Sequence, residues 1–600
     1  MVTEEGDTPG DMPAEPNGVA ATGDAMMRAG GDEAWWKSAV VYQVYPRSFA
    51  DSDGDGVGDL PGVLARLDHI ADLGADVLWL SPIYPSPQHD NGYDISDYQD
   101  IDPMFGTLAD LDALLSAVHD RGMKLILDLV VNHTSAEHPW FLESRRRRDS
   151  AKADWYFWRD ARPGTVPGEP GSEPNNWGSA FSGSAWEWAP DRGQYYLHLF
   201  AVSQPDLNWD NQEVRDAVFA MMGWWLDRGV DGFRMDVINF ISKDPALPDG
   251  PLTRSGYGDG MPHFSYGPQI HSYLAEMKRR VFDSRTGSYL TVGEMPGVTP
   301  GQARAFTDRD RGQLNMVFQF EHVSLDHDGD KWTPRAVTVP DLRETLARWQ
   351  VELAHDGWNS LYWNNHDQPR VVSRYGDDAT YWFESATALA TVLHLHRGTP
   401  YIYQGEELGM TNVPFSDIGS FRDIESLRYY EQATTAERLD PSHVMATLRQ
   451  KSRDNARTPM QWTAGPGAGF TTGTPWIPLN PNHSWLNADA QKAGHRSIYC
   501  YYKELIALRR AEPVLIDGDF ELYANTPDTV YAFRRCVADD CIEVFANLSG
   551  DEVQLDALDH GADQVLLGNY PIQNTVPGRL APWEARAFRR SPKPPDADPR

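Results

Sequence analysis

Residues 232–240 have the sequence GFRMDVINF, a short apolar run in which Arg234 stands two residues before Asp236. Side chains two positions apart share one side of a strand, so the arginine charge would keep that carboxylate ionised. Two further carboxylates end strand-like runs in the same way, Glu294 in YLTVGEM and Asp367 in NSLYWNNHD. A single arginine and aspartate could be a structural ion pair, which also perturbs pKa values. Three acids at three strand ends instead predict one active site.

Outward from this stretch, short apolar and β-branched runs alternate with amphipathic helical stretches, which is the pattern of a parallel sheet wrapped by helices. The chain contains eight such runs: VVYQVYP, VLWLSP, KLILDLVVNH, GFRMDV, YLTVGEM, NMVFQFE, NSLYWNNHD and TPYIYQGEE. Eight β/α units predict a (β/α)8 TIM barrel with its active site at the C-terminal ends of the strands. Asp236, Glu294 and Asp367 would end strands four, five and seven, and His133 would end strand three.

The runs also divide the chain into domains. Residues 1–32 are acidic, contain Pro and Gly, and are expected to form a disordered tail. The barrel is expected over residues 33–132 and 204–511. Residues 133–203 are too long for a simple connection and rich in aromatic residues, so they predict a subdomain inserted over the mouth. Residues 512–595 contain short alternating runs separated by turn residues, which predict a C-terminal β-sandwich.

Composition excludes several classes of partner. The net charge of -34 and the pI of about 4.8 would repel nucleic acid phosphates and anionic membrane surfaces, so we expect a small neutral substrate. No stretch approaches the 18 apolar residues of a membrane span, and the N-terminus has no secretory pattern. Three cysteines, all after residue 499, are too few for a disulfide framework, and a reduced, cytoplasmic protein fits. The oligomeric state stays open, a monomer included.

Two carboxylates that act as nucleophile and acid across a small gap are what retaining glycoside hydrolysis requires. From about Trp35 to near Arg590 the chain resembles the α-amylase superfamily (glycoside hydrolase family 13), and within it the exo-acting α-glucosidases of the oligo-1,6-glucosidase type. The resemblance implies that Asp236 in GFRMD is the nucleophile and Glu294 in VGEM the acid/base. Asp367 in NNHD would stabilise the transition state.

The resemblance also implies a closed pocket around the terminal glucose, and hence exo cleavage. Arg234 would pair with Asp128 as well as with the nucleophile. His133 in DLVVNH and His366 in NNHD would donate hydrogen bonds to glucose hydroxyls. The remaining residues would grip, stack on or enclose that sugar: Asp90 and Tyr93 in QHDNGYD, Arg457 in NARTPMQW, and the aromatic walls Phe181 and Phe200.

Two positions bear on linkage preference in the resembling family. A valine directly after the nucleophile, here Val237, accompanies α-1,6 preference, whereas Thr or Ala accompanies α-1,4 enzymes. Gln204 in QPDLNW agrees with the α-1,6 type. The alternative is that Val237 simply packs the barrel.

The loop DSDGDGVGD, residues 51–59, places oxygen atoms at alternate positions in the manner of a calcium loop. It is not a full EF-hand, because the twelfth position is Gly62 instead of a glutamate. An Asp/Gly turn cluster without metal is the alternative, and the resemblance favours a structural Ca²⁺ or Mg²⁺ with no organic cofactor. The expected ligands are Asp51, Asp53, Asp55 and Asp59 through carboxylates and Val57 through its carbonyl.

Two other functions remain as alternatives. One is a transglycosylating α-glucosidase or a sucrose isomerase on the same scaffold, although NNHDQPRVVSRYGDD resembles the hydrolase version of that segment. The other is a non-catalytic homologue that serves as a transporter subunit or binding module. The intact acid triad and the missing membrane anchor count against this second alternative.

Overall fold

The computed structural model describes residues 34–555, 564–571 and 576–590. The acidic tail predicted for residues 1–32 and the last residues of the predicted C-terminal domain lie outside this range. Across the described ranges, no helix combines the length and apolar character that a membrane crossing needs.

The barrel predicted from the eight runs is confirmed, because each run contains one strand of a parallel eight-stranded sheet. Its strands are β1 (Val41–Val44), β2 (Val77–Leu80), β3 (Lys124–Val130), β7 (Gly232–Asp236), β8 (Leu290–Glu294), β9 (Met316–Phe318), β10 (Ser360–Leu361) and β11 (Thr399–Tyr403). The order is β10-β11-β1-β2-β3-β7-β8-β9, and a parallel bridge between Val317 and Asn359 closes the ring.

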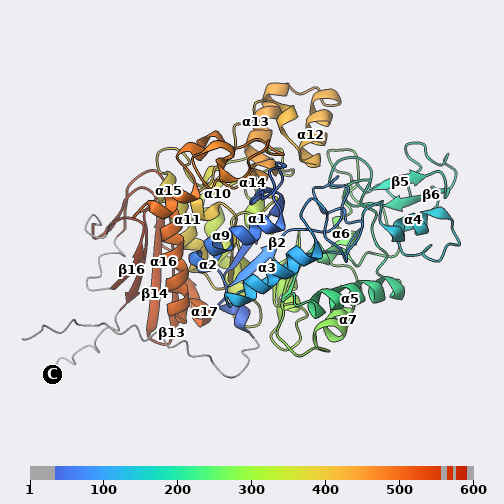
Figure 1. The fold of residues 1–600 in the computed structure, drawn as a ribbon. Coiled ribbons are helices and arrows are strands. Elements are labelled where there is room, and N and C mark those ends of the chain that lie inside the picture. The colour runs from blue at the N-terminus through green and yellow to red at the C-terminus, as the bar shows by residue number, and fades with distance from the viewer. Residues whose placement is uncertain (1–33, 556–563, 572–575, 591–600) are drawn as a thin grey trace, which may run out of the picture.

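Helices surround this sheet, as Figure 1 shows. Outside the two insertions described below, the helices of the described residues are α1 (Leu60–Ala65), α2 (Leu67–Leu73), α3 (Leu108–Asp120), α5 (Gln212–Asp227), α6 (Met261–Phe264), α7 (Ile270–Met277), α8 (Pro300–Thr307), α9 (Val339–Glu352), α10 (Val371–Tyr375), α11 (Trp382–His394), α14 (Asp454–Arg457), α15 (Ala488–Ala493), α16 (Ile498–Ala511) and α17 (Val514–Asp517). Local sequence sets their ends: Thr107 and Asp110 form a capping box at the start of α3.

The barrel interior is a packed core and not a pore, since alternate strand residues fill it. Trp79, Phe318 and Tyr401 pack against one another there, with ring centroids 4.6 to 6.1 Å apart. Gly232 shows why the GFRMD motif begins with glycine. Its φ is 151°, and a Cβ would lie 1.9 Å from the Leu290 carbonyl oxygen of the next strand. The motif therefore brings β7 close against β8.

An inserted subdomain follows β3, to the right in Figure 1. It contains α4 (Pro139–Arg146) and a small antiparallel sheet of β4 (Trp158–Arg159), β6 (Gln194–Leu197) and β5 (Trp186–Ala189). Most of its aromatic residues are core, as their burial shows: Trp177, for example, is fully buried. A second insertion, after β11, forms a hairpin of α12 (Ile424–Thr435) and α13 (Pro441–Lys451).

The C-terminal strands form two antiparallel sheets, as expected for a β-sandwich. One has the order β12 (Asp519–Leu522), β13 (Val530–Val537), β14 (Asp540–Asn547), β18 (Ala585–Arg590) and β16 (Gln564–Gly568). The other pairs β15 (Val553–Gln554) with β17 (Arg579–Leu580). Helices α16 and α17 lie between the larger sheet and the barrel (Figure 1).

The prediction of a fully reduced protein is wrong at the β13–β14 hairpin. Cys536 and Cys541 are cross-strand partners with Cα atoms 4.2 Å apart, and they form a disulfide. The hairpin register makes this possible, because it places two residues five apart in sequence directly opposite each other. Cys500 keeps a free thiol, so one short bridge and no disulfide framework is present in the described residues.

Candidate active site

Arg234 joins the carboxylates that the strands bring to the carboxyl-terminal edge of the barrel. Asp236 is the last residue of β7 and Glu294 the last residue of β8, and these strands are neighbours. The Arg234 guanidinium lies 2.6 Å from Asp236 and 2.7 Å from Glu294. It also lies 2.7 Å from Asp128 of β3, as predicted. One buried arginine therefore holds both members of the candidate catalytic pair close together, as a retaining mechanism requires.

The two carboxyl groups of this pair have different pKa values. Burial raises the pKa of Asp236 to about 6, and Arg234 opposes that shift. Burial raises the pKa of Glu294 further, to about 8, although Arg234 and the Val237 N–H lower it. Between these values one group is ionised while the other keeps its proton. Environments that separate two pKa values in this way assign a nucleophile and an acid.

Asp367 lies six residues beyond β10 and pairs with two arginines other than Arg234. Its Oδ1 is 2.6 Å from Arg457 and 3.3 Å from Arg453. Burial alone would raise the pKa of Asp367, but His366, Arg453 and Arg457 together lower it far below its usual range. This third carboxylate therefore stays charged at every pH of interest.

His366 offers a hydrogen-bond donor beside Asp367. Gln43 Nε2 lies 2.9 Å from His366 Nδ1 and donates to it. Nδ1 therefore carries no proton, and the proton of the neutral ring is on Nε2. That Nε2 is buried, lies 3.5 Å from Asp367 Oδ2, and has no hydrogen-bond partner in the described structure. Burial lowers the pKa of His366 to about 3, so the ring is neutral. Tyr93 stacks on this ring with centroids 5.1 Å apart.

His133 differs from the expectation that it donates to the sugar. Its Nε2 lies 3.2 Å from the Tyr93 carbonyl oxygen and 3.2 Å from Gln204 Nε2, while Asn132 Nδ2 approaches Nδ1. Burial lowers the pKa of His133 to about 4, which keeps it neutral. Its donor is therefore committed to the protein in this structure, and its role toward substrate stays a prediction.

Asp90 and Gln204, which the sequence assigns separate roles, lie together. Gln204 donates to Asp90 Oδ2 at 3.0 Å, and Arg453 donates to Asp90 Oδ1 at 3.1 Å. Burial raises the pKa of Asp90 to about 7, with Arg453 and Arg457 opposing the shift.

The sequence analysis missed Arg453, which pairs with several carboxylates around Asp367. Its guanidinium lies between Asp90, Asp367 and Asp423, and 3.5 Å from Glu425. A signal was present in KSRDNARTPMQW, because arginines four residues apart share one face of a helical turn.

The aromatic wall is formed by residues of the inserted subdomain. Phe181 and Phe200 have ring centroids 5.8 Å apart, and Phe200 lies 5.1 Å from the His133 ring. The Arg453 guanidinium lies 5.0 Å from the centre of the Phe181 ring, a cation–π distance. The prediction that both phenylalanines are aromatic walls of the pocket is therefore consistent with the geometry.

Val237 has an unusual backbone. Its φ is 33°, which is rare and strained for a β-branched residue. This conformation directs the Val237 N–H to Glu294 Oε2 at 3.0 Å. The side chain packs into the aromatic cluster of the inserted subdomain with Phe240 and Phe264, so it contributes to packing as well as to the wall.

A second group that the sequence analysis missed lies behind this wall. Lys243 Nζ is 2.9 Å from Asp206 Oδ2, and it donates to Asn132 Oδ1 at 3.0 Å and to the Phe240 carbonyl at 2.8 Å. Lys243 and Asp206 are buried, so this pair fixes the segment after Asp236 to the segment that directly follows the inserted subdomain. A lysine within the apolar stretch INFISK was the available signal.

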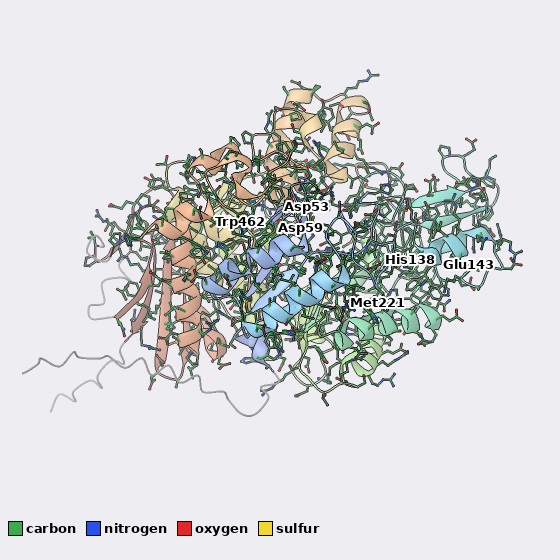
Figure 2. All side chains as sticks on the ribbon, in the orientation of Figure 1. Asp53, Asp59, His138, Glu143, Met221 and Trp462 are labelled. Atoms are coloured by element: carbon green, nitrogen blue, oxygen red, sulfur yellow. A yellow bond between two sulfur atoms is a disulfide. The ribbon has the colours of Figure 1, made fainter. Side chains whose placement is uncertain are left out.

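The loop at residues 51–59 gathers part of its expected ligand set. Carboxylate oxygens of Asp51, Asp53 and Asp59 lie within 4.8 Å of one another, and Figure 2 shows Asp53 and Asp59 side by side near α1. Asp55 is not in this group of carboxylates, and its Oδ1 accepts the Val57 N–H at 2.7 Å. The Val57 carbonyl takes no part in that bond, and its role as a ligand stays a prediction. Asp51 and Asp59 also accept loop hydrogen bonds, from Gly56 and Ser52 among others. The three carboxylates fit a hard, oxygen-binding cation.

A buried pair of carboxyl groups with separated pKa values, at the strand ends of a TIM barrel, is the chemistry of glycoside hydrolases, and the protein is an enzyme of that class. Residues 43–518 match the family described as "Alpha amylase, catalytic domain". The chain therefore belongs to the α-amylase family.

Three relatives show how the family extends. The oligo-1,6-glucosidase of Parageobacillus thermoglucosidasius is 51% identical over 566 residues, which are 93% of this chain and 99% of the relative. The trehalose-6-phosphate hydrolase structure from Bacillus licheniformis is 45% identical with a TM-score of 0.86, covering 92% of this chain and 99% of that one. The isomaltulose synthase structure from Klebsiella sp. LX3 is 40% identical with a TM-score of 0.87, covering 93% and 99%.

Proposed function

We propose that the protein is a retaining, exo-acting α-glucosidase that releases glucose from the non-reducing ends of short α-glucosides and prefers α-1,6 linkages. The observation that carries this proposal is the pair Asp236 and Glu294 on one Arg234 guanidinium, with pKa values of about 6 and about 8. At neutral pH the first is ionised and the second is protonated, which is the state that glycosidic bond cleavage needs.

The mechanism follows from these two states. An Asp236 oxygen attacks the anomeric carbon while Glu294 gives its proton to the departing glycosidic oxygen, and a glucosyl ester forms on Asp236. Glu294, now ionised, takes a proton from water, and that water displaces Asp236 to release glucose. Asp367 stays charged throughout and would stabilise the positive charge that develops on the sugar ring.

Exo cleavage is supported by the buried ion pairs around Asp367. Arg453 and Arg457 hold Asp90 and Asp367 together, and Tyr93 stacks on His366 beside them. A chain that continued past the terminal glucose would have to displace these buried ion pairs. Their free polar atoms would instead bind hydroxyls of one non-reducing-end sugar.

The α-1,6 preference rests on Val237 and Gln204 and on several relatives named oligo-1,6-glucosidase at about half identity. The trehalose-6-phosphate hydrolases and isomaltulose synthases among the similar proteins share the barrel and define the alternatives. Initial rates on isomaltose, maltose, sucrose, trehalose and trehalose 6-phosphate, with products resolved, test the choice. Release of glucose from isomaltose at the highest kcat/KM supports the proposal, and conversion of sucrose to an isomer would replace it.

The role of Asp236 has a direct test. A mechanism-based inhibitor that traps the glucosyl ester should label Asp236, and Asp236→Asn should lose nearly all activity at an unchanged melting temperature, since an amide cannot form the ester. Labelling of Glu294 or Asp367 instead would show that the roles are assigned wrongly.

Two further parts of the proposal concern the setting of the enzyme. A structural Ca²⁺ or Mg²⁺ would bind Asp51, Asp53 and Asp59 on the outside of the barrel, with no part in the chemistry. The low cysteine number favours the cytoplasm, whereas the Cys536–Cys541 bridge fits an oxidising compartment. Cell fractionation with an antibody against the protein decides between them.

A further inference from the structure

Asp423 is a fully buried carboxylate with no role in the mechanism above, although it contacts both arginines that hold Asp367. Its Oδ1 accepts hydrogen bonds from Arg453 Nε at 2.9 Å and from Arg457 at 3.3 Å. Its Oδ2 accepts the Ser426 N–H at 3.1 Å as the N-cap of α12. One oxygen therefore serves the arginines, and the other starts a helix.

The position of Asp423 is similar to that of Asp128 on the side of the nucleophile. Asp128 has no exposed surface and pairs with Arg234, the arginine that holds the catalytic pair. Asp423 also has no exposed surface, and it pairs with the two arginines that hold Asp367. Each of these arginines thus bonds to a buried carboxylate in addition to the carboxylates that act on the sugar.

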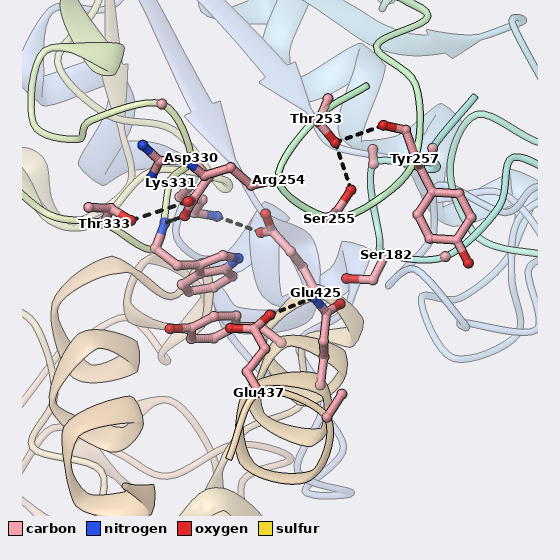
Figure 3. A pocket seen from close by; sticks show the side chains of 18 of the residues that line it. Ser182, Thr253, Arg254, Ser255, Tyr257, Asp330, Lys331, Thr333, Glu425 and Glu437 are labelled. Carbon is pink, nitrogen blue, oxygen red and sulfur yellow. Dashed lines mark hydrogen bonds and ion pairs between the residues drawn. The ribbon is translucent and has the colours of Figure 1, made fainter. Parts of the chain in front are cut away.

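The contacts of Asp423 show that it balances charge. The contacting side chains around it include three cations and three carboxylates: Arg453, Arg457 and Lys331, and Asp367, Asp423 and Glu425. Lys331 and Glu425 form their pair at 2.5 Å in the wall of the cavity at the barrel mouth, as Figure 3 shows. Asp90 adds a negative charge only in part near neutral pH, because burial raises its pKa to about 7. Without Asp423, the cations would equal or outnumber the ionised carboxylates.

Asp423 keeps its charge over the whole pH range of activity. Burial alone would raise the pKa of Asp423, but Arg453 and Arg457 lower it well below its usual range. The neighbouring Asp454 does not take its place, because Asp454 Oδ2 accepts the backbone N–H groups of Arg422 and Asp423. Of these two acids, Asp423 is therefore the one that pairs with the arginines.

This charge acts on the transition state more than on the bound substrate. The glucose ring is neutral in the substrate and becomes positive only as the glycosidic bond breaks. Asp367 attracts that positive charge, whereas unbalanced guanidinium groups beside Asp367 would repel it. An interaction that favours the transition state over the ground state raises the rate.

We propose that Asp423 is a positioning residue that neutralises Arg453 and Arg457, so that the negative charge of Asp367 stabilises the positive sugar ring of the transition state. Asp423 acts through the two arginines and does not touch the substrate. The inference rests on the proposed glucosidase function, and it adds to that function a buried residue whose charge sets the rate.

The test compares two ligands that differ only in charge. 1-Deoxynojirimycin has a protonated ring nitrogen, and 1,5-anhydroglucitol has an oxygen in its place. Asp423→Asn keeps the helix cap and removes the charge. Its affinity for the cationic ligand, measured by calorimetry, should fall about tenfold, while its affinity for the neutral ligand stays nearly unchanged. Its kcat/KM for isomaltose should fall by a similar factor, because the transition state is also positive.

Asp440→Asn is the matched control. Asp440 caps α13 through the Ser442 N–H as Asp423 caps α12, and among the described residues no ion pair includes it. This variant loses the same unit of charge, and both affinities and kcat/KM should stay at the wild-type values. Asp423→Ser, which also has an N-cap side chain, replaces Asp423→Asn should that variant not fold.

The outcomes separate the two proposals. Failure of wild type to bind either ligand and to hydrolyse an aryl α-glucoside would refute the proposed function itself. Hydrolysis by wild type, with an equal loss of affinity for both ligands in Asp423→Asn, would overturn only the role of Asp423, since a structural defect does not select by charge. Unchanged affinity for both ligands, or the same selective loss in Asp440→Asn, would overturn that role as well.

Discussion

Replacement of Glu294 by glutamine tests whether Glu294 is the group that must carry a proton for activity. Glu294 must carry its proton to act as an acid, and burial raises its pKa to about 8. Asp236 must be ionised, and burial raises its pKa to about 6. Activity of the wild type should therefore fall as pH drops through the lower value and fall again as pH rises through the upper one.

The size of the effect follows from these two pKa values. The productive form, with Asp236 ionised and Glu294 protonated, makes up about four fifths of the enzyme at about pH 7 and about one tenth at about pH 5 or pH 9. Glu294→Gln removes the alkaline limb, because an amide does not titrate. On isomaltose the variant should lose a factor of about 10² to 10⁴, the usual worth of a positioned acid.

The assay uses α-glucosyl fluoride, whose leaving group needs little protonation, so the variant keeps enough activity for a complete pH profile of kcat/KM. The expected profile rises through about pH 6 and then stays level. An alkaline limb that persists in Glu294→Gln would refute the reasoning. Asp90, whose pKa burial raises to about 7, would then be the next group to replace.

Three other predictions concern linkage, the cation and the buried ion pair. Val237→Thr should shift the ratio of isomaltose to maltose hydrolysis toward maltose by about tenfold, since the new hydroxyl changes the wall that meets the leaving sugar. An unchanged ratio with both rates reduced would mean that Val237 only packs. A chelator should lower the melting temperature more than the initial rate, because a bound ion stabilises the native state; immediate loss of activity at a constant melting temperature would mark a catalytic metal. Lys243→Met should cost about 3–5 kcal/mol of unfolding free energy in a denaturant titration, because Asp206 is left as an unpaired buried charge. Adding Asp206→Asn should recover part of that cost, and no recovery would contradict the pairing.

Most of the fold could be predicted because the barrel repeats one local pattern. Each buried parallel strand is a short apolar run, and each run was visible without knowledge of its neighbours. The three acids could be placed for the same reason, since the end of a strand in sequence is the end of a strand in space. The resemblance then supplied roles that spacing alone could not.

What could not be predicted depends on contacts between distant segments. Arg453 acquires its importance from Asp90, which is 363 residues away in sequence. The disulfide between Cys536 and Cys541 depends on hairpin register, which counting cysteines does not reveal. The spacing of Asp55 predicts a metal ligand, yet its carboxylate lies outside the group formed by Asp51, Asp53 and Asp59 and accepts the Val57 N–H instead. Alternation of acids therefore predicts a turn before it predicts a ligand set.

β10, the strand that leads to Asp367, lies where the barrel closes on β9. β10 has only two residues, and one of them, Leu361, lies opposite Pro400, which has no N–H to donate. On the other side, a single bridge from the neighbouring Asn359 to Val317 joins this segment to β9. Two side chains hold β10 against β9. The Ser360 hydroxyl donates at 2.7 Å to the Val317 carbonyl of β9, and the Tyr362 hydroxyl donates at 2.7 Å to the Gln319 carbonyl just after β9. Backbone amides at residues 359–361 should consequently exchange with deuterium earlier than those of the neighbouring strands. On gentle heating, the barrel would then open first at β10, the strand that leads to Asp367. Activity would therefore be lost before the whole protein melts.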